Sequence, residues 1–179
     1  MKPPAVLLAV FAAAACSSQG GNGQAPAAGT MRPGLWEMTT RVVTVEAPTA
    51  PPEIQAQLQA AMAAQPQVER SCLTPAEAAN PGTAIRDRVI QGQSGYSCET
   101  GESVFAGGRI RMTLNCRSTS GAPDLRQAMA GSYTAETMQA AISGEGATPA
   151  TATSPSIPVR VESTLIGRRV GECTGTETE

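Results

Sequence analysis

Two cysteines placed around a pair of glycines constrain the fold of this chain more than any other feature of its sequence. Cys98 and Cys116 are symmetric about position 107, and the segment Ala106-Gly107-Gly108 predicts a three-residue hairpin turn in which glycine supplies a positive φ. Opposing cysteines on the two strands of a hairpin can meet disulfide geometry. We therefore predict an antiparallel hairpin closed by a Cys98–Cys116 disulfide.

The second strand of this hairpin shows a clear two-residue period. In RIRMTLNC, residues 109–116, apolar side chains point one way and polar side chains point the other, which is typical of a half-buried strand with arginines in water. The hairpin register places Glu102 opposite Met112 on the apolar face. We expect a β-bulge at Gly101 to relieve this contact.

Other segments extend the β pattern. GLWEMTTRVVTVE, residues 34–46, alternates, with Trp36, Met38 and Val42 expected on one face and Leu35, Glu37, Arg41 and Val45 on the other. Residues 157–165 also alternate, and strands are favoured over a helix for residues 127–143. The sequence predicts a mainly β domain, either an antiparallel meander sheet or a small barrel-like domain, stapled by disulfides and carrying one or two short helices.

Two helices are expected. Residues 52–64 begin with prolines, carry Glu53 in the first turn and place Ile54, Leu58 and Met62 at i, i+4 and i+8. This helix is a loosely docked insertion or a partner-binding helix. The second begins at the capping box Thr74-Pro75-Ala76-Glu77 and ends at Asn80-Pro81-Gly82. Residues 144–158, rich in Ala, Thr, Pro and Ser, predict a loop.

The N-terminus predicts an export signal, residues 1–15. Lys2 precedes a short apolar run that ends in alanines directly before Cys16, which is typical of a lipid-accepting cysteine. The run is shorter than the roughly 20 apolar residues that span a bilayer. Ordinary secretory cleavage after Ala15 is the alternative. Ser17 after the cysteine is typical of lipoproteins passed to the outer membrane.

The cysteine count favours lipidation. Five cysteines leave one unpaired, and an exposed free thiol is a liability in an oxidising compartment. If Cys16 carries lipid, four cysteines remain, and after the hairpin pair Cys72 joins Cys173 by elimination. Residues 16–30 are small, polar and uncharged, so we expect a flexible tether there and a single domain over residues 31–179.

Composition excludes several chemistries. The chain has no histidine, and its only lysine is Lys2, which rules out histidine-based triads, histidine metal sites and Schiff-base lysines in the mature protein. No C-x-x-C motif is present, so neither a zinc site nor a redox motif is expected. The chain has 12 arginines and 15 acidic residues and no basic run, so we expect no nucleic-acid partner. We predict no metal and no cofactor.

Three classes of function remain open at the level of sequence. The first is a non-catalytic binding or scaffold module in the cell envelope, held at the membrane by its N-terminal lipid, with an unidentified ligand or protein partner. The second is an enzyme that uses carboxylates such as Glu99 and Glu102, although carboxylates on a strand are usually solvated. The third is a thiol oxidoreductase, which needs an exposed, reactive cysteine.

Trp36 is expected to be a packing residue, with a membrane or glycan contact as the alternative.

Several motifs together resemble a known family. Arg32-Pro33-Gly34-Leu35-Trp36-Glu37, Cys72-Leu73-Thr74-Pro75, the Cys98–Cys116 hairpin and Gly167-Arg168-Arg169-Val170-Gly171-Glu172-Cys173 occur in an order and spacing similar to those of the bacterial family DUF3617. The resemblance covers residues 31–173. It implies a small exported protein, often a lipoprotein, with mostly antiparallel β structure and paired cysteines. It supplies no catalytic residues.

Overall fold

A computed structural model describes residues 29–63, 65–150 and 155–175 of the chain. The predicted signal segment, Cys16 and nearly all of the predicted tether therefore lie outside the described residues. The elements along the chain are β1 (Gly34–Glu46), α1 (Pro52–Ala63), β2 (Gln67–Leu73), α2 (Pro75–Ala79), α3 (Pro81–Gln91), β3 (Tyr96–Ala106), β4 (Arg109–Ser118), β5 (Leu125–Tyr133), β6 (Thr137–Ala147) and β7 (Pro158–Gly171).

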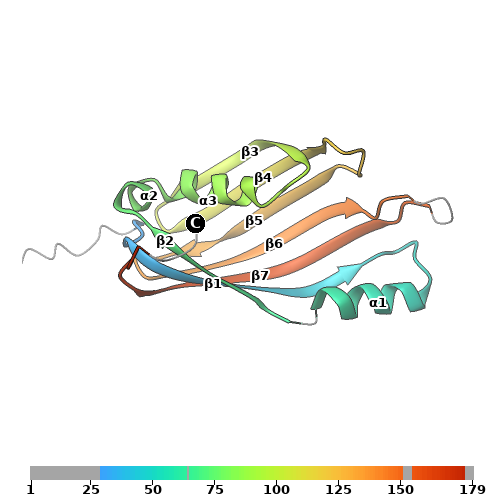
Figure 1. Ribbon diagram of the computed structural model, residues 1–179, viewed down its shortest axis with the longest axis horizontal. Helices are drawn as coiled ribbons and strands as arrows, with labels where there is room; N and C mark the ends of the chain where they lie inside the picture. Colours follow the sequence, from blue (N-terminus) through green and yellow to red (C-terminus); the bar gives the residue numbers. More distant parts are fainter. Residues whose placement is uncertain (1–28, 64, 151–154, 176–179) are drawn as a thin grey trace, which may run out of the picture.

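The seven strands form one antiparallel sheet in the order β2-β1-β7-β6-β5-β4-β3. Strands β3 to β7 form a meander, and β7 then pairs with β1, so the first and last strands lie side by side. The sheet curls into a half-barrel, and α2 and α3 lie across it between β2 and β3 (Figure 1). The predicted mainly β, disulfide-stapled fold is confirmed. We call the concave face, which packs against α3, the inner face and the opposite face the outer face.

The β3–β4 hairpin forms with a shorter turn than predicted. Ala106 pairs with Arg109, so the turn has two residues, Gly107 and Gly108, with φ of 58° and 76°. Such positive φ values at both positions are typical of the tight turns that match strand twist. The predicted bulge is confirmed as a register shift between Thr100 and Ser103, and it adds back the residue that the turn lacks. Cys98 therefore still pairs with Cys116.

A β-bulge corrects the predicted facing of β1. Trp36 and Met38 point to the inner face as expected, but the register with β7 shifts between Val42 and Thr44. The extra residue reverses the alternation beyond it. Val45, predicted on the opposite face from Trp36, therefore pairs with Val161 on the inner side and is 1% exposed.

The structure has three helices within its described residues, one more than predicted. The expected helix at residues 52–64 is α1, and the Thr74 capping box begins α2. The segment Asn80-Pro81-Gly82 ends the short helix α2 as predicted, with Asn80 as its C-cap, but Pro81 is also the first residue of α3, which was not predicted. Proline is favoured at a first helical position, where its missing N–H has no partner to lose.

The second half of the chain is more regular than expected. Residues 127–143 are strands, as favoured, within β5 and β6. The predicted loop at residues 144–158 was too long, because β6 continues to Ala147 and pairs with β7 as far as Pro158.

The core lies between the inner face and α2 and α3. It contains Trp36, Leu73, Ile85, Ile110, Met112, Leu114, Met129, Tyr133, Met138 and Leu165. Disulfides join Cys98 to Cys116 and Cys72 to Cys173. The second of these ties the start of α2 to the segment after β7. No helix among the described residues is long and apolar enough to cross a membrane.

Candidate functional site

Two of the sequence motifs meet at the end of the sheet where β1 begins and β7 ends. Arg169 on β7 donates from Nε to the Pro33 carbonyl at 2.7 Å and from Nη2 to the Glu172 carboxylate. Its side chain lies directly over Gly34, where a Cβ atom would come within 2.6 Å of Arg169 Nε. Gly34 also has φ of 135°. Only glycine fits this position, which explains the Pro-Gly pair of the first motif.

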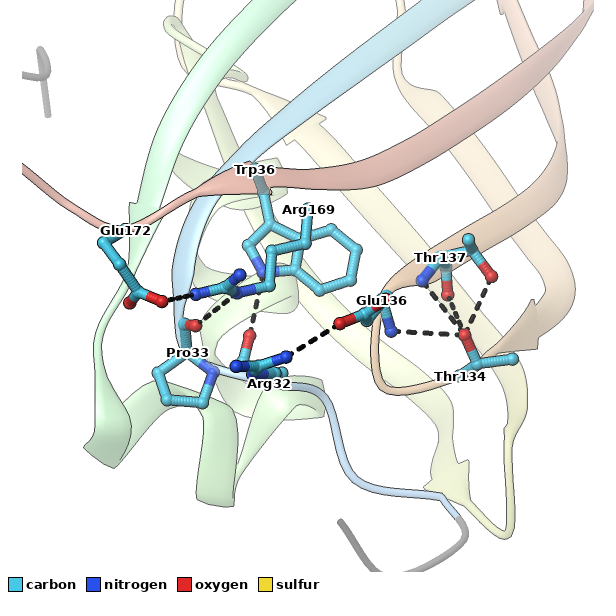
Figure 2. Close-up of polar contacts among 8 residues, drawn as sticks. All are labelled: Arg32, Pro33, Trp36, Thr134, Glu136, Thr137, Arg169 and Glu172. Carbon is cyan, nitrogen blue, oxygen red and sulfur yellow. Dashed lines mark hydrogen bonds and ion pairs between the residues drawn. The ribbon is translucent and has the colours of Figure 1, made fainter. Parts of the chain in front are cut away.

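The turn between β5 and β6 completes this end of the molecule (Figure 2). Arg32 donates from its backbone N to the Ala135 carbonyl at 2.8 Å and from Nη1 to the Glu136 carboxylate at 2.9 Å. Trp36 donates from Nε1 to the Arg32 carbonyl at 3.0 Å. We call Arg32, Pro33, Trp36, Glu136, Arg169 and Glu172 the end cluster. Its bonds are internal, so its role is to hold three chain segments together.

The third motif anchors the helices. Thr74 Oγ1 accepts from the Glu77 N–H at 3.3 Å, and the Glu77 carboxylate accepts from the Thr74 N–H at 2.7 Å. Burial raises the pKa of Glu77, but the Thr74 hydrogen bonds and Arg88 outweigh it and leave this pKa below its ordinary value. The neighbouring Cys72 is fixed by its disulfide. The start of α2 is thus held by a capping box, an ion pair and a covalent bond.

A groove lies between α3 and the inner face of the sheet. It consists of two adjoining cavities of about 390 Å³ and 370 Å³ that share Thr40, Gln67, Arg88, Val89, Met129 and Ile142. Small-molecule sites in proteins span roughly 300–1,000 Å³. We call this space the α3 groove, and it is the candidate functional site.

The α3 groove is apolar next to the end cluster. Trp36, Leu73, Ile85 and Leu165 line this part. Four of the seven methionines of the chain also line the groove, namely Met31, Met38, Met112 and Met129. Methionine has a flexible, polarisable side chain and is common on surfaces that adapt to varied apolar ligands. This part of the groove is suited to a flexible apolar chain.

The opposite part of the α3 groove places several uncharged polar side chains among apolar ones such as Met112 and Leu114. Thr40, Gln67, Gln93, Gln127 and Ser163 line the second cavity. We call these five residues the polar mouth. Arg88 and Glu69 are the charged residues among those that line the two cavities. The site therefore combines an apolar wall with a few hydrogen-bonding groups, the usual composition of a small-molecule site.

The structure does not bring the candidate catalytic carboxylates into this groove. Glu99 and Glu102 are exposed on the edge strand β3, and neither lines the groove. Glu102 follows Gly101 in the bulge, where its N–H donates to Thr113 Oγ1 at 2.9 Å. These positions favour solvated surface charges over a general acid–base pair.

The cysteines of the domain do not form a reactive-thiol site. Cys72, Cys98, Cys116 and Cys173 are all disulfide-bonded. Within the described residues, no group of three or more acidic or cysteine side chains could hold a metal ion.

Trp36 is 2% exposed, as a packing residue should be, and it also forms part of the groove wall.

The α3 groove was not found from the sequence. The available signal was the spacing of Ile85 and Val89, one helical turn apart, after Pro81. The methionines gave a second signal, since Met38, Met112 and Met129 each lie at inward positions of strands. Neither signal identifies a cavity, because the cavity depends on the curl of the whole sheet.

Comparison with known proteins identifies the family of this chain. A search of curated proteins and a search of solved structures found no match. A model of the family described as a protein of unknown function, DUF3617, matches residues 31–173, which include β1 to β7 and both disulfides. The chain therefore belongs to the DUF3617 family.

Proposed function

We propose that this protein is a non-catalytic lipoprotein of the cell envelope that binds one flexible apolar chain, such as an acyl chain, in the α3 groove. The observation that carries the proposal is the groove wall, which combines Trp36, Leu165 and four methionines beneath α3. Burial of a hydrocarbon chain contributes about 0.8 kcal/mol per CH2 group. A carboxylate enzyme or a thiol oxidoreductase finds no support in the positions of Glu99, Glu102 and the paired cysteines.

The anchor is part of the same proposal. A lipid on Cys16 would hold the domain at the membrane, at the outer membrane facing the periplasm if Ser17 acts as a sorting signal. Mass spectrometry of the membrane fraction should find a lipidated N-terminal peptide that begins at Cys16. An unmodified N-terminus recovered from the soluble periplasm would contradict lipidation, and it would leave the groove proposal in place.

Trp36 provides a direct test of binding. It is the only tryptophan of the chain and lies in the groove wall, so a brominated acyl chain in the groove should quench its fluorescence by contact. The same lipid without bromine is the control. Saturable quenching supports the proposal, and unchanged fluorescence at all ligand concentrations contradicts it.

Blocking variants locate the ligand. Thr40 lines both cavities, and Thr40→Phe should fill the groove and abolish quenching. Thr39 is the adjacent residue on the outer face, where it pairs with Val68 and Ile166. Thr39→Phe is therefore the matched control and should bind as the wild type does. Equal loss of quenching in both variants would place the ligand elsewhere.

A further inference from the structure

We infer that the α3 groove selects amphiphiles with an uncharged, hydrogen-bonding head over those with an anionic head. This inference rests on the proposed function and specifies its ligand class. Its basis is the set of charged side chains in and around the groove and the partners that they already have. The cationic group that lines the groove is already neutralised by the protein, whereas the uncharged polar groups of the mouth remain open.

Arg88 is engaged by three acceptors of the protein. Its guanidinium donates to Ser71 Oγ at 3.0 Å, to the Cys72 carbonyl at 2.8 Å and to the Glu77 carboxylate at 2.9 Å. Glu77 also caps α2 through its other carboxylate oxygen, so the capping box holds this carboxylate in place beside Arg88. Arg88 thus acts as a strut between α3 and β2.

The remaining charge near the site opposes an anion as well. Glu69 lines the groove from the edge strand β2, and Glu77 lies beside Arg88. Two carboxylates against one guanidinium leave this region with a net negative charge. A carboxylate or phosphate head would be repelled there, and like charges in a partly desolvated site cost binding energy.

The polar mouth is suited to a neutral head. Within the described part of the chain, the side chains of Thr40, Gln67, Gln93, Gln127 and Ser163 make no hydrogen bond to another residue. None of the described polar side-chain atoms is both buried and unpartnered, so these groups reach open space in the groove. Amides and hydroxyls both donate and accept, as the hydroxyls of an acylglycerol do.

The experiment compares two brominated ligands that share one acyl chain, namely a monoacylglycerol and a fatty acid at a pH where it is ionised. Each is titrated below its micelle concentration, and Trp36 quenching gives its affinity. The monoacylglycerol should bind about tenfold more tightly than the ionised fatty acid. Its affinity should not change with added salt, because no ion pair forms.

Two variants test the source of the preference. Gln67→Leu combined with Gln127→Leu should remove most of the advantage of the monoacylglycerol, whereas Gln139→Leu on the outer face is the matched control. Glu77→Gln should keep the capping box, which accepts glutamine, and free the charge of Arg88. This variant should therefore bind the fatty acid several-fold more tightly than the wild type does.

The outcomes separate the two proposals. If the fatty acid quenches Trp36 at the same or a lower concentration than the monoacylglycerol, the head-group inference is overturned and the groove proposal stands. If neither ligand quenches Trp36, the proposed function itself fails.

Discussion

The helices α1 and α3 have nearly the same length, 12 and 11 residues, but they are attached to the sheet in different ways. In α3, Pro81, Ala84 and Ile85 are buried, and Ile85 and Val89 cover the groove. In α1 no residue is buried. It is held by side-chain hydrogen bonds, in which Gln59 accepts from the Val45 N–H at 2.7 Å and Gln55 bonds both the Ala47 N–H and the Val45 carbonyl.

This difference shows that amphipathic spacing alone does not determine which helix belongs to the core. The apolar row of α1, Ile54, Leu58 and Met62, has the same spacing as Pro81, Ile85 and Val89 of α3, yet no residue of α1 is buried. Its glutamines provide hydrogen-bond partners for backbone groups at the end of β1, near the bulge. We therefore expect the side of the domain that carries α3 to determine global stability, and the side that carries α1 to open independently.

The largest expected effect comes from the disulfide at the base of the α3 side. Cys72 and Cys173 are 101 residues apart, and Cys98 and Cys116 are 18 apart. The chain-entropy model assigns nearly 5 kcal/mol to the longer loop and about 3 kcal/mol to the shorter one. Replacing Cys72 and Cys173 with serine should therefore lower the free energy of unfolding more than replacing Cys98 and Cys116. Denaturant titration measures both, and a larger loss from the hairpin pair would contradict the ranking.

The next effect compares the two helices directly. Ile85→Ala removes buried side-chain volume beneath α3 and should destabilise the protein by about 2–5 kcal/mol. Ile54→Ala on α1 is the matched control, and it should cost well under half as much because that side chain is only half-buried. Both values come from chemical denaturation monitored by circular dichroism. Similar losses would show that α1 is part of the cooperative core.

A smaller effect tests how α1 is attached. Gln55→Ala leaves two backbone groups of buried residues, the Ala47 N–H and the Val45 carbonyl, without their partner, which should cost about 1 kcal/mol. Gln57→Ala on the exposed side of the same helix should leave stability unchanged. Hydrogen exchange should also show faster exchange at Ala47 in the first variant alone. Protection that is equal in both variants would mean that the glutamine bond does not hold this region.

The smallest effect depends on pH and concerns strands β1, β2 and β7. Glu37 on the outer face of β1 accepts hydrogen bonds from Arg70 on β2 and Arg168 on β7, and these arginines hold its pKa below its ordinary value. A lowered pKa in the folded state adds stability above the unfolded-state value of about 4.3. That stability is lost as the pH falls through the lower, folded-state pKa.

In the Glu37→Gln variant, the free energy of unfolding should therefore fall less steeply between neutral and acidic pH than in the wild type. At pH 7 the variant should be only modestly less stable. Both arginines are about two-thirds exposed, at 64% and 66%, so the ion pairs contribute little at neutral pH. Urea titrations across this pH range provide the measurement. Parallel stability curves for the variant and the wild type would show that Glu37 is not a source of acid sensitivity.

Local patterns predicted the local parts of the fold. The alternation in residues 109–116 and the glycines beside it were sufficient for the β3–β4 hairpin, and the capping box at Thr74 was sufficient for the start of α2. The predicted turn was one residue too long, but the register at Cys98 was correct because the bulge at Gly101 compensated for it.

The failures are all long-range. Proline and glycine after Asn80 are typical of a helix end, and only packing into the core shows that Ile85 and Val89 belong to another helix. Val45 changed sides because of a bulge that no residue type announces. The groove itself depends on the pairing of β1 with β7, whose partners are more than 100 residues apart in the chain.

The end cluster has a kinetic consequence. Because Arg32 and Arg169 tie the start of β1 to the β5–β6 turn and the end of β7, the groove wall at Trp36 is held in place by several bonds. When a chain bound as proposed leaves this wall, each methylene withdrawn exposes more hydrocarbon to water. Residence time should therefore grow with chain length, about fourfold for each added CH2 group until the groove is full.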